Sequence, residues 1–159
     1  TRNDNALIEA EKVDKYAEKV KVLDNNSKFI GTEINERKKM GLLINSDYED
    51  YFLQGSINNG LIQHQLHLSI KYTSDNWRNY YSASFSKVNQ VDITLISTSA
   101  ANCSGSSCDY TEVMELNLSD DFLRSNMETG FSIVFNSKKS TNKITIPSNY
   151  IKGYLKVAK

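Results

Sequence analysis

The stretch IQHQLHLSIKYT at residues 62–73 is the clearest alternation of apolar and polar residues in the chain. Side chains of a β-strand point alternately to the two faces of its sheet, so this pattern predicts a strand with one buried face. The expected buried side chains are Ile62, His64, Leu66, Leu68, Ile70 and Tyr72. The residues between them, which include His67, are expected on the opposite face.

Turn signals and further alternations surround this strand. Asn59-Gly60 precedes it, and both residues tolerate positive φ, so the pair predicts a type I′ turn from a strand at residues 51–58. Shorter strands are expected near residues 20–22, 28–32, 77–85, 91–95, 110–118, 131–135 and 144–146. Seven to nine short strands with frequent turns are typical of a mainly β protein, an antiparallel β-sandwich.

Two helices are expected within this frame. Ser119 can cap a short helix near residues 120–128, because its hydroxyl accepts a hydrogen bond from the first turn. Pro147, the only proline, suits the start of a C-terminal helix near residues 147–157, where apolar residues recur at helical spacing. A third helix is expected from about Asn5 to Tyr16.

The charge distribution divides the chain. Residues 1–40 hold 17 of the 38 charged side chains, which predicts a charged, partly helical N-terminal arm at residues 1–17 before a single domain at residues 18–159. The formal net charge is zero, which argues against nucleic-acid partners and against polybasic attachment to membranes. No run approaches the roughly 20 apolar residues of a transmembrane helix.

Cys103 and Cys108 are the only cysteines, and they lie in a short polar segment between two expected strands. A turn of this length easily brings two Cα atoms to the separation that a disulfide needs. A structural zinc site needs more ligands, and a redox pair has the spacing Cys-x-x-Cys. We therefore expect a disulfide and an oxidising compartment, with two free thiols as the alternative.

The sequence names no catalytic residue, metal site or cofactor. It lacks a Gly-x-Ser-x-Gly elbow, a phosphate-binding loop and a dinucleotide fingerprint. His64 and His67 fall on opposite faces of one strand and cannot share a metal, so His64 is expected in the core and His67 in solvent. Asp47, Glu49 and Asp50 form an acidic cluster without EF-hand spacing, which makes a calcium site the less favoured interpretation.

The aromatic run at residues 77–81 supplies the candidate partner contact. If it is a strand, Trp77 and Tyr81 point into the core, whereas Arg78 and Tyr80 are exposed. Exposed tyrosine and arginine side chains are enriched at protein interfaces. The alternative is an ordinary cluster of side chains under a loop.

Three groups of residues carry a resemblance to a family: Trp77-Arg78 with Tyr80, Cys108-x-Tyr110-x-Glu112, and Ile146-Pro147-x-x-Tyr150-Ile151-x-Gly153-x-Leu155. Over residues 18–157 the chain resembles uncharacterised bacterial exported proteins, often predicted lipoproteins; residues 33–40 have no counterpart. The resemblance implies a signal sequence and a lipidated cysteine just before Thr1, hence a periplasmic or cell-surface protein. It transfers no catalytic residue.

Three functions follow as hypotheses. The first is a non-enzymatic binding or interaction module of the cell envelope that contacts protein or glycan. The second is a hydrolase-type enzyme with a site assembled from dispersed residues, for which a cleft should join an acidic residue to His67 or a serine. The third is a structural subunit of an envelope assembly, for which an exposed apolar patch or an unpaired edge strand is expected.

Overall fold

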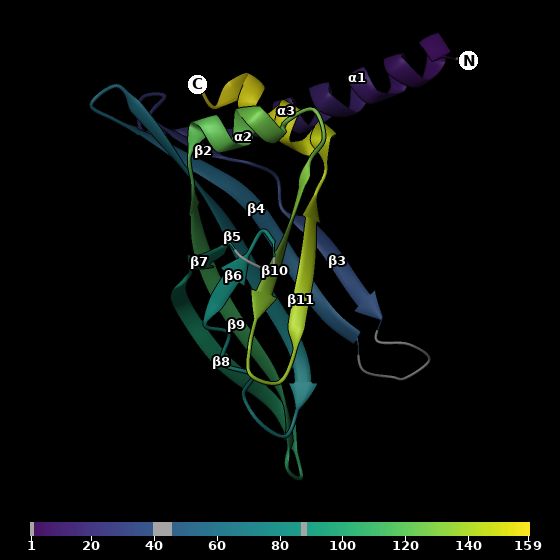
Figure 1. The fold of residues 1–159 in the computed structure, drawn as a ribbon, viewed down its shortest axis with the longest axis vertical. Helices are drawn as coiled ribbons and strands as arrows, with labels where there is room; N and C mark the ends of the chain where they lie inside the picture. The colour runs from purple at the N-terminus through teal and green to yellow at the C-terminus, as the bar shows by residue number, and fades with distance from the viewer. Residues whose placement is uncertain (1, 40–45, 87–88) are drawn as a thin grey trace.

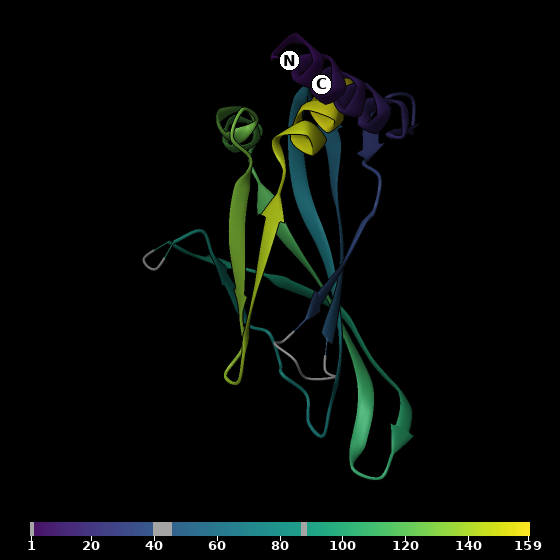
Figure 2. The ribbon, with the colours of Figure 1, turned by 90° about the vertical axis from the view of Figure 1, so that its right-hand side faces the viewer.

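The structure of the chain is a computed structural model that describes residues 2–39, 46–86 and 89–159. It is mainly β, as expected: two antiparallel sheets form a sandwich-like body, and three helices lie at one end of it (Figure 1). The turned view separates the sheets into two layers, with the helices above both (Figure 2).

Sheet A has seven strands in the order β1-β2-β4-β5-β9-β8, with β3 also paired to β4. Its strands are β1 (Lys21–Leu23), β2 (Lys28–Ile30), β3 (Ile34–Lys39), β4 (Ser46–Asn58), β5 (Leu61–Ser74), β8 (Thr94–Ser104) and β9 (Ser107–Leu118). The turn between β4 and β5 is the expected one, since Asn59 and Gly60 have φ values of 52° and 78°.

Sheet B has four strands in the order β11-β10-β6-β7. They are β6 (Ser82–Ser84), β7 (Gln90–Asp92), β10 (Phe131–Asn136) and β11 (Thr141–Ile146). The described residues thus form eleven strands, more than the seven to nine expected. One cause is that the strand expected at residues 91–95 is two strands, because β7 pairs in sheet B and β8 in sheet A.

The core lies between the inner faces of the two sheets. The alternation in β5 is confirmed, because every second residue from His64 to Tyr72 is buried. Opposite them, sheet B contributes the buried side chains of Ala83, Ile133, Phe135, Ile144 and Ile146. Burial of these apolar faces supplies the main driving force for pairing the two layers.

Both expected helices of the body are present: α2 (Asp120–Asn126) and α3 (Ser148–Val157). The Ser119 hydroxyl caps α2 by accepting the Phe122 amide at 3.0 Å, and Pro147 precedes the first turn of α3. The buried side of α3 carries the expected stripe, Tyr150, Ile151, Tyr154 and Leu155. None of the helices among the described residues is long and apolar enough to cross a membrane.

The N-terminal helix α1 (Arg2–Glu18) lies along α3. Gly153 makes this approach possible, because a Cβ there would lie 2.5 Å from the Tyr16 Cβ and 2.7 Å from the Val13 carbonyl oxygen. The Lys156 ammonium donates to Asp14 at 2.7 Å at the exposed side of the contact. The helical part of the arm is therefore longer than expected and is packed on the C-terminal helix.

The expected strand at residues 77–85 is wrong over its first half, since strand pairing begins only at Ser82. Asn79 has a φ of 58°, a left-handed conformation that interrupts strand alternation. As a result Tyr80 is buried, with 5% exposure, and Tyr81 is 56% exposed, the reverse of the prediction. The exposed pair of Arg78 and Tyr80 that the sequence suggested does not exist, because both side chains turn into the core.

Candidate functional site

A buried polar cluster lies between the sheets at the end of the core away from the helices. We call Asp47, Glu49, Arg78, Tyr80, Glu112 and Asn142 the Arg78 cluster. The guanidinium of Arg78 donates to both Asp47 carboxylate oxygens, at 2.6 and 3.0 Å, and lies 4.1 Å from the centre of the Tyr72 ring. This two-point contact fixes the arginine in one orientation.

The rest of the cluster ties the loop before β6 to three strands. The Tyr80 hydroxyl donates to the Asn142 side-chain oxygen, and the Asn142 amide donates to Asp47 at 2.8 Å and to Glu49 at 3.0 Å. Glu112 accepts the Tyr72 hydroxyl and the backbone amide of Tyr80, the latter at 3.1 Å. Burial raises the pKa of the Tyr72 and Tyr80 hydroxyls, which keeps both neutral and able to donate.

The acidic cluster seen in the sequence is divided by the β4 strand. Asp47 and Glu49 point into the core, whereas Asp50 lies on the opposite face, where burial and the nearby Glu33 raise the pKa of its carboxyl. Across the described ranges, no group of three His, Cys, Asp or Glu residues is arranged to hold a metal ion. A loop calcium site at these three residues is therefore not formed.

His64 joins β5 to two helices. Its Nε2 lies 2.8 Å from an Asp120 carboxylate oxygen and its Nδ1 lies 2.7 Å from the Tyr154 hydroxyl. Burial lowers the pKa of His64, although the hydrogen bond with Asp120 works in the opposite direction. A Cβ on Gly55 would lie 2.5 Å from the Tyr154 oxygen, so only glycine leaves room for this contact. The expected core histidine is confirmed, with both ring nitrogens partnered.

His67 lies on the opposite face of β5, as expected. It is half-buried rather than free in solvent: its Nδ1 lies 3.1 Å from Glu115, and its ring stacks on Phe52 with centroids 4.6 Å apart. A carboxylate beside His67 meets one part of the hydrolase hypothesis, which also asks for a cleft around the two residues, and His67 does not line the open groove on the outer face of sheet B. The pair lies on the outer face of sheet A, where the Gln54 amide also donates to Glu115 at 3.0 Å.

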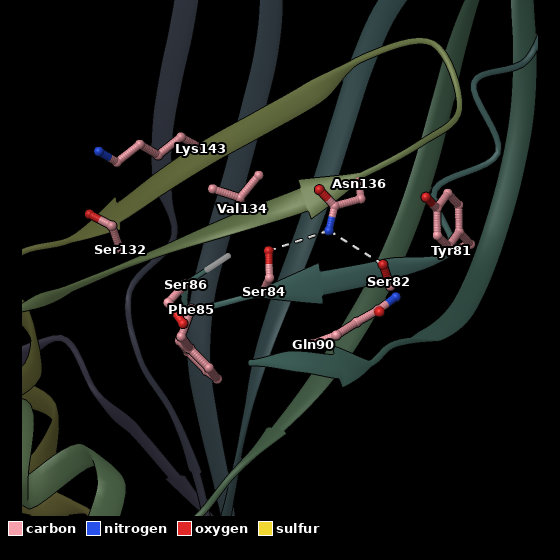
Figure 3. Close-up of a pocket in the computed structure, with 10 residues that line it drawn as sticks. All are labelled: Tyr81, Ser82, Ser84, Phe85, Ser86, Gln90, Ser132, Val134, Asn136 and Lys143. Atoms are coloured by element: carbon pink, nitrogen blue, oxygen red, sulfur yellow. Dashed lines mark hydrogen bonds between the residues drawn. The ribbon is translucent and has the colours of Figure 1, made fainter. Parts of the chain in front are cut away.

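The outer face of sheet B carries an open groove of about 610 Å³ (Figure 3). We call it the sheet B groove; it is lined by Tyr81, Ser82, Ser84, Phe85, Ser86, Gln90, Ser132, Val134, Asn136 and Lys143. The Asn136 amide lies between two serine hydroxyls, 3.3 Å from Ser82 and 3.4 Å from Ser84. Its floor therefore presents hydroxyl and amide groups beside the apolar side chains of Phe85 and Val134, and the exposed Tyr81 ring stands at its edge.

Sequence reasoning missed this groove because its lining comes from four short strands far apart in the chain. The sequence carried only a weak, local sign of the groove, because Ser132, Val134 and Asn136 alternate along β10 with the buried residues Ile133 and Phe135. Such an alternation predicts a solvated face but does not say which other strands share it.

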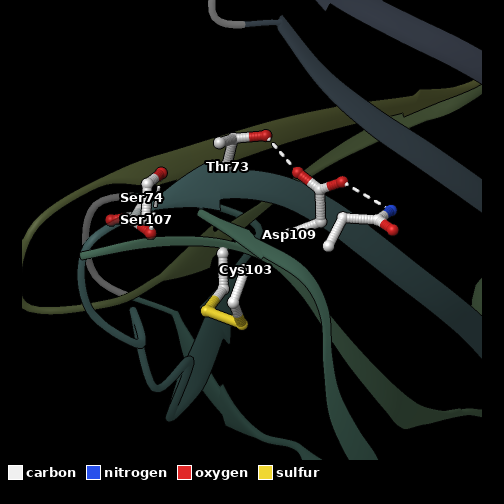
Figure 4. Close-up of a disulfide and its surroundings, with 7 residues drawn as sticks. Thr73, Ser74, Cys103, Ser107 and Asp109 are labelled. Atoms are coloured by element: carbon white, nitrogen blue, oxygen red, sulfur yellow. Dashed lines mark hydrogen bonds between the residues drawn. A yellow bond between two sulfur atoms is a disulfide. The ribbon is translucent and has the colours of Figure 1, made fainter. Parts of the chain in front are cut away.

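Cys103 and Cys108 form the expected disulfide, which links β8 to β9 near the tip of their hairpin (Figure 4). Beside it, Asp109 accepts the Thr73 hydroxyl at 2.6 Å and the Asn102 amide at 3.1 Å. The Thr73 contact ties the hairpin to the neighbouring strand β5, whereas the Asn102 contact and the disulfide join β8 to β9. They give the cysteines a structural role in this part of the sheet.

The disulfide leads to a first prediction. Unreduced protein from an oxidising compartment should weigh about 2 Da less than the reduced form, measured by intact mass spectrometry. Cys103→Ser with Cys108→Ser should lower the free energy of unfolding by about 2 kcal/mol, because a short loop in the unfolded chain is no longer closed. Reduced wild-type protein is the control and should show the same loss; two free thiols in the native protein would contradict the assignment.

Comparison with protein-family models, curated proteins and solved structures finds no match for the chain. The resemblance to bacterial exported proteins therefore stays a prediction. The sheet B groove brings serine hydroxyls, side-chain amides and one lysine together in a single recess of the described structure.

Proposed function

We propose that the chain is a non-enzymatic binding module of the bacterial cell envelope, and that the sheet B groove binds a glycan. The observation that carries the proposal is the exposed tyrosine ring of Tyr81 beside a floor of hydroxyl and amide groups. A sugar presents the matching chemistry, since each of its rings has hydroxyls at the rim and C–H groups on its faces.

The lining can satisfy sugar hydroxyls in both directions. Serine hydroxyls donate and accept, and the Gln90 and Asn136 side chains offer both an N–H donor and a carbonyl acceptor. The aromatic face of Tyr81 is a surface on which the C–H groups of a sugar can stack. Among the ten described lining residues only Lys143 is charged, which favours a glycan with a carboxylate or a phosphate.

The proposed location rests on separate observations. A structural disulfide fits a protein that folds in an oxidising compartment such as the periplasm. The resemblance to exported bacterial proteins favours the same location and an anchoring lipid upstream of Thr1. Under this proposal the protein presents the groove to envelope polysaccharide from a fixed position at a membrane surface.

A second prediction tests the groove. Tyr81→Ala should weaken binding of an acidic oligosaccharide about fivefold, because one stacked ring contributes on the order of 1 kcal/mol. Isothermal calorimetry against uronic-acid oligosaccharides, with neutral oligosaccharides of equal length as the comparison, measures the effect. Tyr48→Ala is the matched control, since Tyr48 is 44% exposed but lies on sheet A. The proposal fails if no acidic or neutral glycan binds, or if both substitutions act alike.

A further inference from the structure

Strand β8 forms an open edge of sheet A. It is the last strand in the sheet order, and its hydrogen-bonded partner within the described residues is β9. All eleven of its residues, Thr94–Ser104, are exposed. Alternate backbone N–H and C=O groups along such an edge point away from the sheet and can pair with another strand.

The sequence of β8 does not protect this edge. Natural edge strands commonly carry lysine, proline or inward-pointing charges that prevent further pairing, but β8 reads TLISTSAANCS, with no charged residue and no proline. Irregular pairing with β9 occurs near Ile96 and beyond Ala101, so the regular segment is Ser97–Ala101. Leu95 and Ile96 next to it are 54% and 47% exposed.

We propose that a second copy of the chain occupies this edge, with the two β8 strands antiparallel about a two-fold axis at Ser99. Closed two-fold pairing is the commonest way in which identical chains associate. Ser99 then opposes Ser99 of the second copy, and Thr98 opposes Ala100. This interface is independent of the sheet B groove and extends the function from a single binding module to a paired one.

Charge is the reason to choose a second copy as the occupant. Like charges placed directly opposite each other destabilise a strand pair, and self-pairing would double any charge on the edge. The regular segment has none, so no repulsion arises at any register of β8 against itself. The formal net charge of the whole chain is zero, which also removes the long-range repulsion that keeps strongly charged proteins monomeric.

The position of β8 leaves room for the partner. The hairpin of β8 and β9 extends beyond the sandwich at the end opposite the helices (Figure 2). The disulfide and the Asn102–Asp109 hydrogen bond join the two strands of this hairpin, and the Thr73–Asp109 hydrogen bond ties it to β5. A second copy would therefore meet a preformed strand, and little conformational entropy would be lost on pairing.

A charge-swap experiment tests the proposal. Sedimentation equilibrium of the wild-type protein should show a reversible dimer. Ser99→Lys and Ser99→Asp should each weaken dimerisation about tenfold or more, because each variant places like charges opposite each other. An equimolar mixture of the two variants should regain the dimer, since lysine then faces aspartate. Leu61→Lys, at a 71% exposed position in the β4–β5 hairpin, is the control and should leave the dimer intact.

Three outcomes would contradict the proposed dimer. A wild-type protein that stays monomeric at high concentration overturns the proposal, as does a dimer that neither Ser99 variant weakens. Failure of the mixed variants to recover the dimer excludes the pairing of Ser99 with itself. Circular dichroism of the monomeric variants should retain the wild-type β spectrum, which separates loss of pairing from loss of folding.

Discussion

Replacement of Arg78 by methionine is expected to lower the free energy of unfolding by about 3–4 kcal/mol. The side chain of Arg78 is 14% exposed and that of Asp47 is 7% exposed, so the substitution leaves a carboxylate in the core without its cation. Breaking a buried ion pair on one side is costly because the remaining charge keeps its desolvation penalty and loses its compensation. Urea denaturation followed by tryptophan fluorescence measures the change.

The Arg78→Met substitution should also weaken contacts outside the ion pair with Asp47. Arg78 also donates to the Tyr80 hydroxyl at 2.9 Å, and Tyr80 holds Asn142 of β11. The Arg78 backbone amide donates to the Tyr72 hydroxyl at 2.8 Å, which should survive the substitution. We therefore expect the loop before β6 to become more mobile while its attachment to β5 persists.

Two further variants separate charge from packing. Arg124→Met removes an arginine whose ion pair with Asp120 is partly exposed, and it should cost less than about 1 kcal/mol. Asp47→Asn combined with Arg78→Met should recover part of the loss, because the uncompensated charge is then removed. Equal effects of Arg78→Met and Arg124→Met, or no recovery in the double variant, would contradict the assignment of a buried, paired Arg78.

The fold was largely predictable because its strongest signals are local. The alternation at residues 62–73, the Asn59-Gly60 turn and the Ser119 cap each depend on residues close together in the sequence. Glu112 shows where such reasoning stops: it occupies an inward position of β9 between Tyr110 and Met114, at a place where a charge is unexpected. Its hydrogen-bond partners are Tyr72 of β5 and the Tyr80 backbone amide in the loop before β6. No local sequence pattern connects either of them to Glu112.

The misplaced Arg78 and Tyr80 have a similar origin. Alternation can be extended from residue to residue only while the backbone stays extended, and Asn79 reverses it with a single left-handed φ. Asparagine is among the residues that adopt this conformation most readily, so Asn79 was the one sequence signal that the strand alternation could break at this point. The sheet B groove had no comparable signal, because it depends on which distant strands become neighbours.

His64→Ala is expected to lower the free energy of unfolding by about 2–4 kcal/mol. The substitution removes both hydrogen bonds of the ring, leaves the buried Tyr154 hydroxyl without its partner, and opens a cavity where β5 meets α2 and α3. His67→Ala is the matched control from the same strand, and it should cost less than about 1 kcal/mol because its contact with Glu115 is part-exposed. Equal costs at the two positions would contradict the assignment of faces on β5.

The same histidine should make stability depend on pH. Burial lowers the pKa of His64 below its ordinary value of about 6.5, so the unfolded chain binds a proton more readily than the folded protein does. The stabilisation is therefore complete above about pH 6.5 and is lost as the pH falls toward the lowered pKa. Asp120 does not interfere in this window: burial alone would raise its pKa, but hydrogen bonds from His64 and Arg124 lower it from its ordinary 3.8.

His64→Gln isolates this titration, because glutamine can hydrogen bond but takes up no proton in this range. The free energy of unfolding of the wild-type protein should fall between pH 7 and pH 5 by up to about 1.4 kcal/mol per pH unit more than that of the variant. Denaturation midpoints measured at several pH values for both proteins give the difference. Parallel pH profiles would mean that His64 accepts a proton equally well in the folded protein, and that Asp120 rather than burial governs its charge.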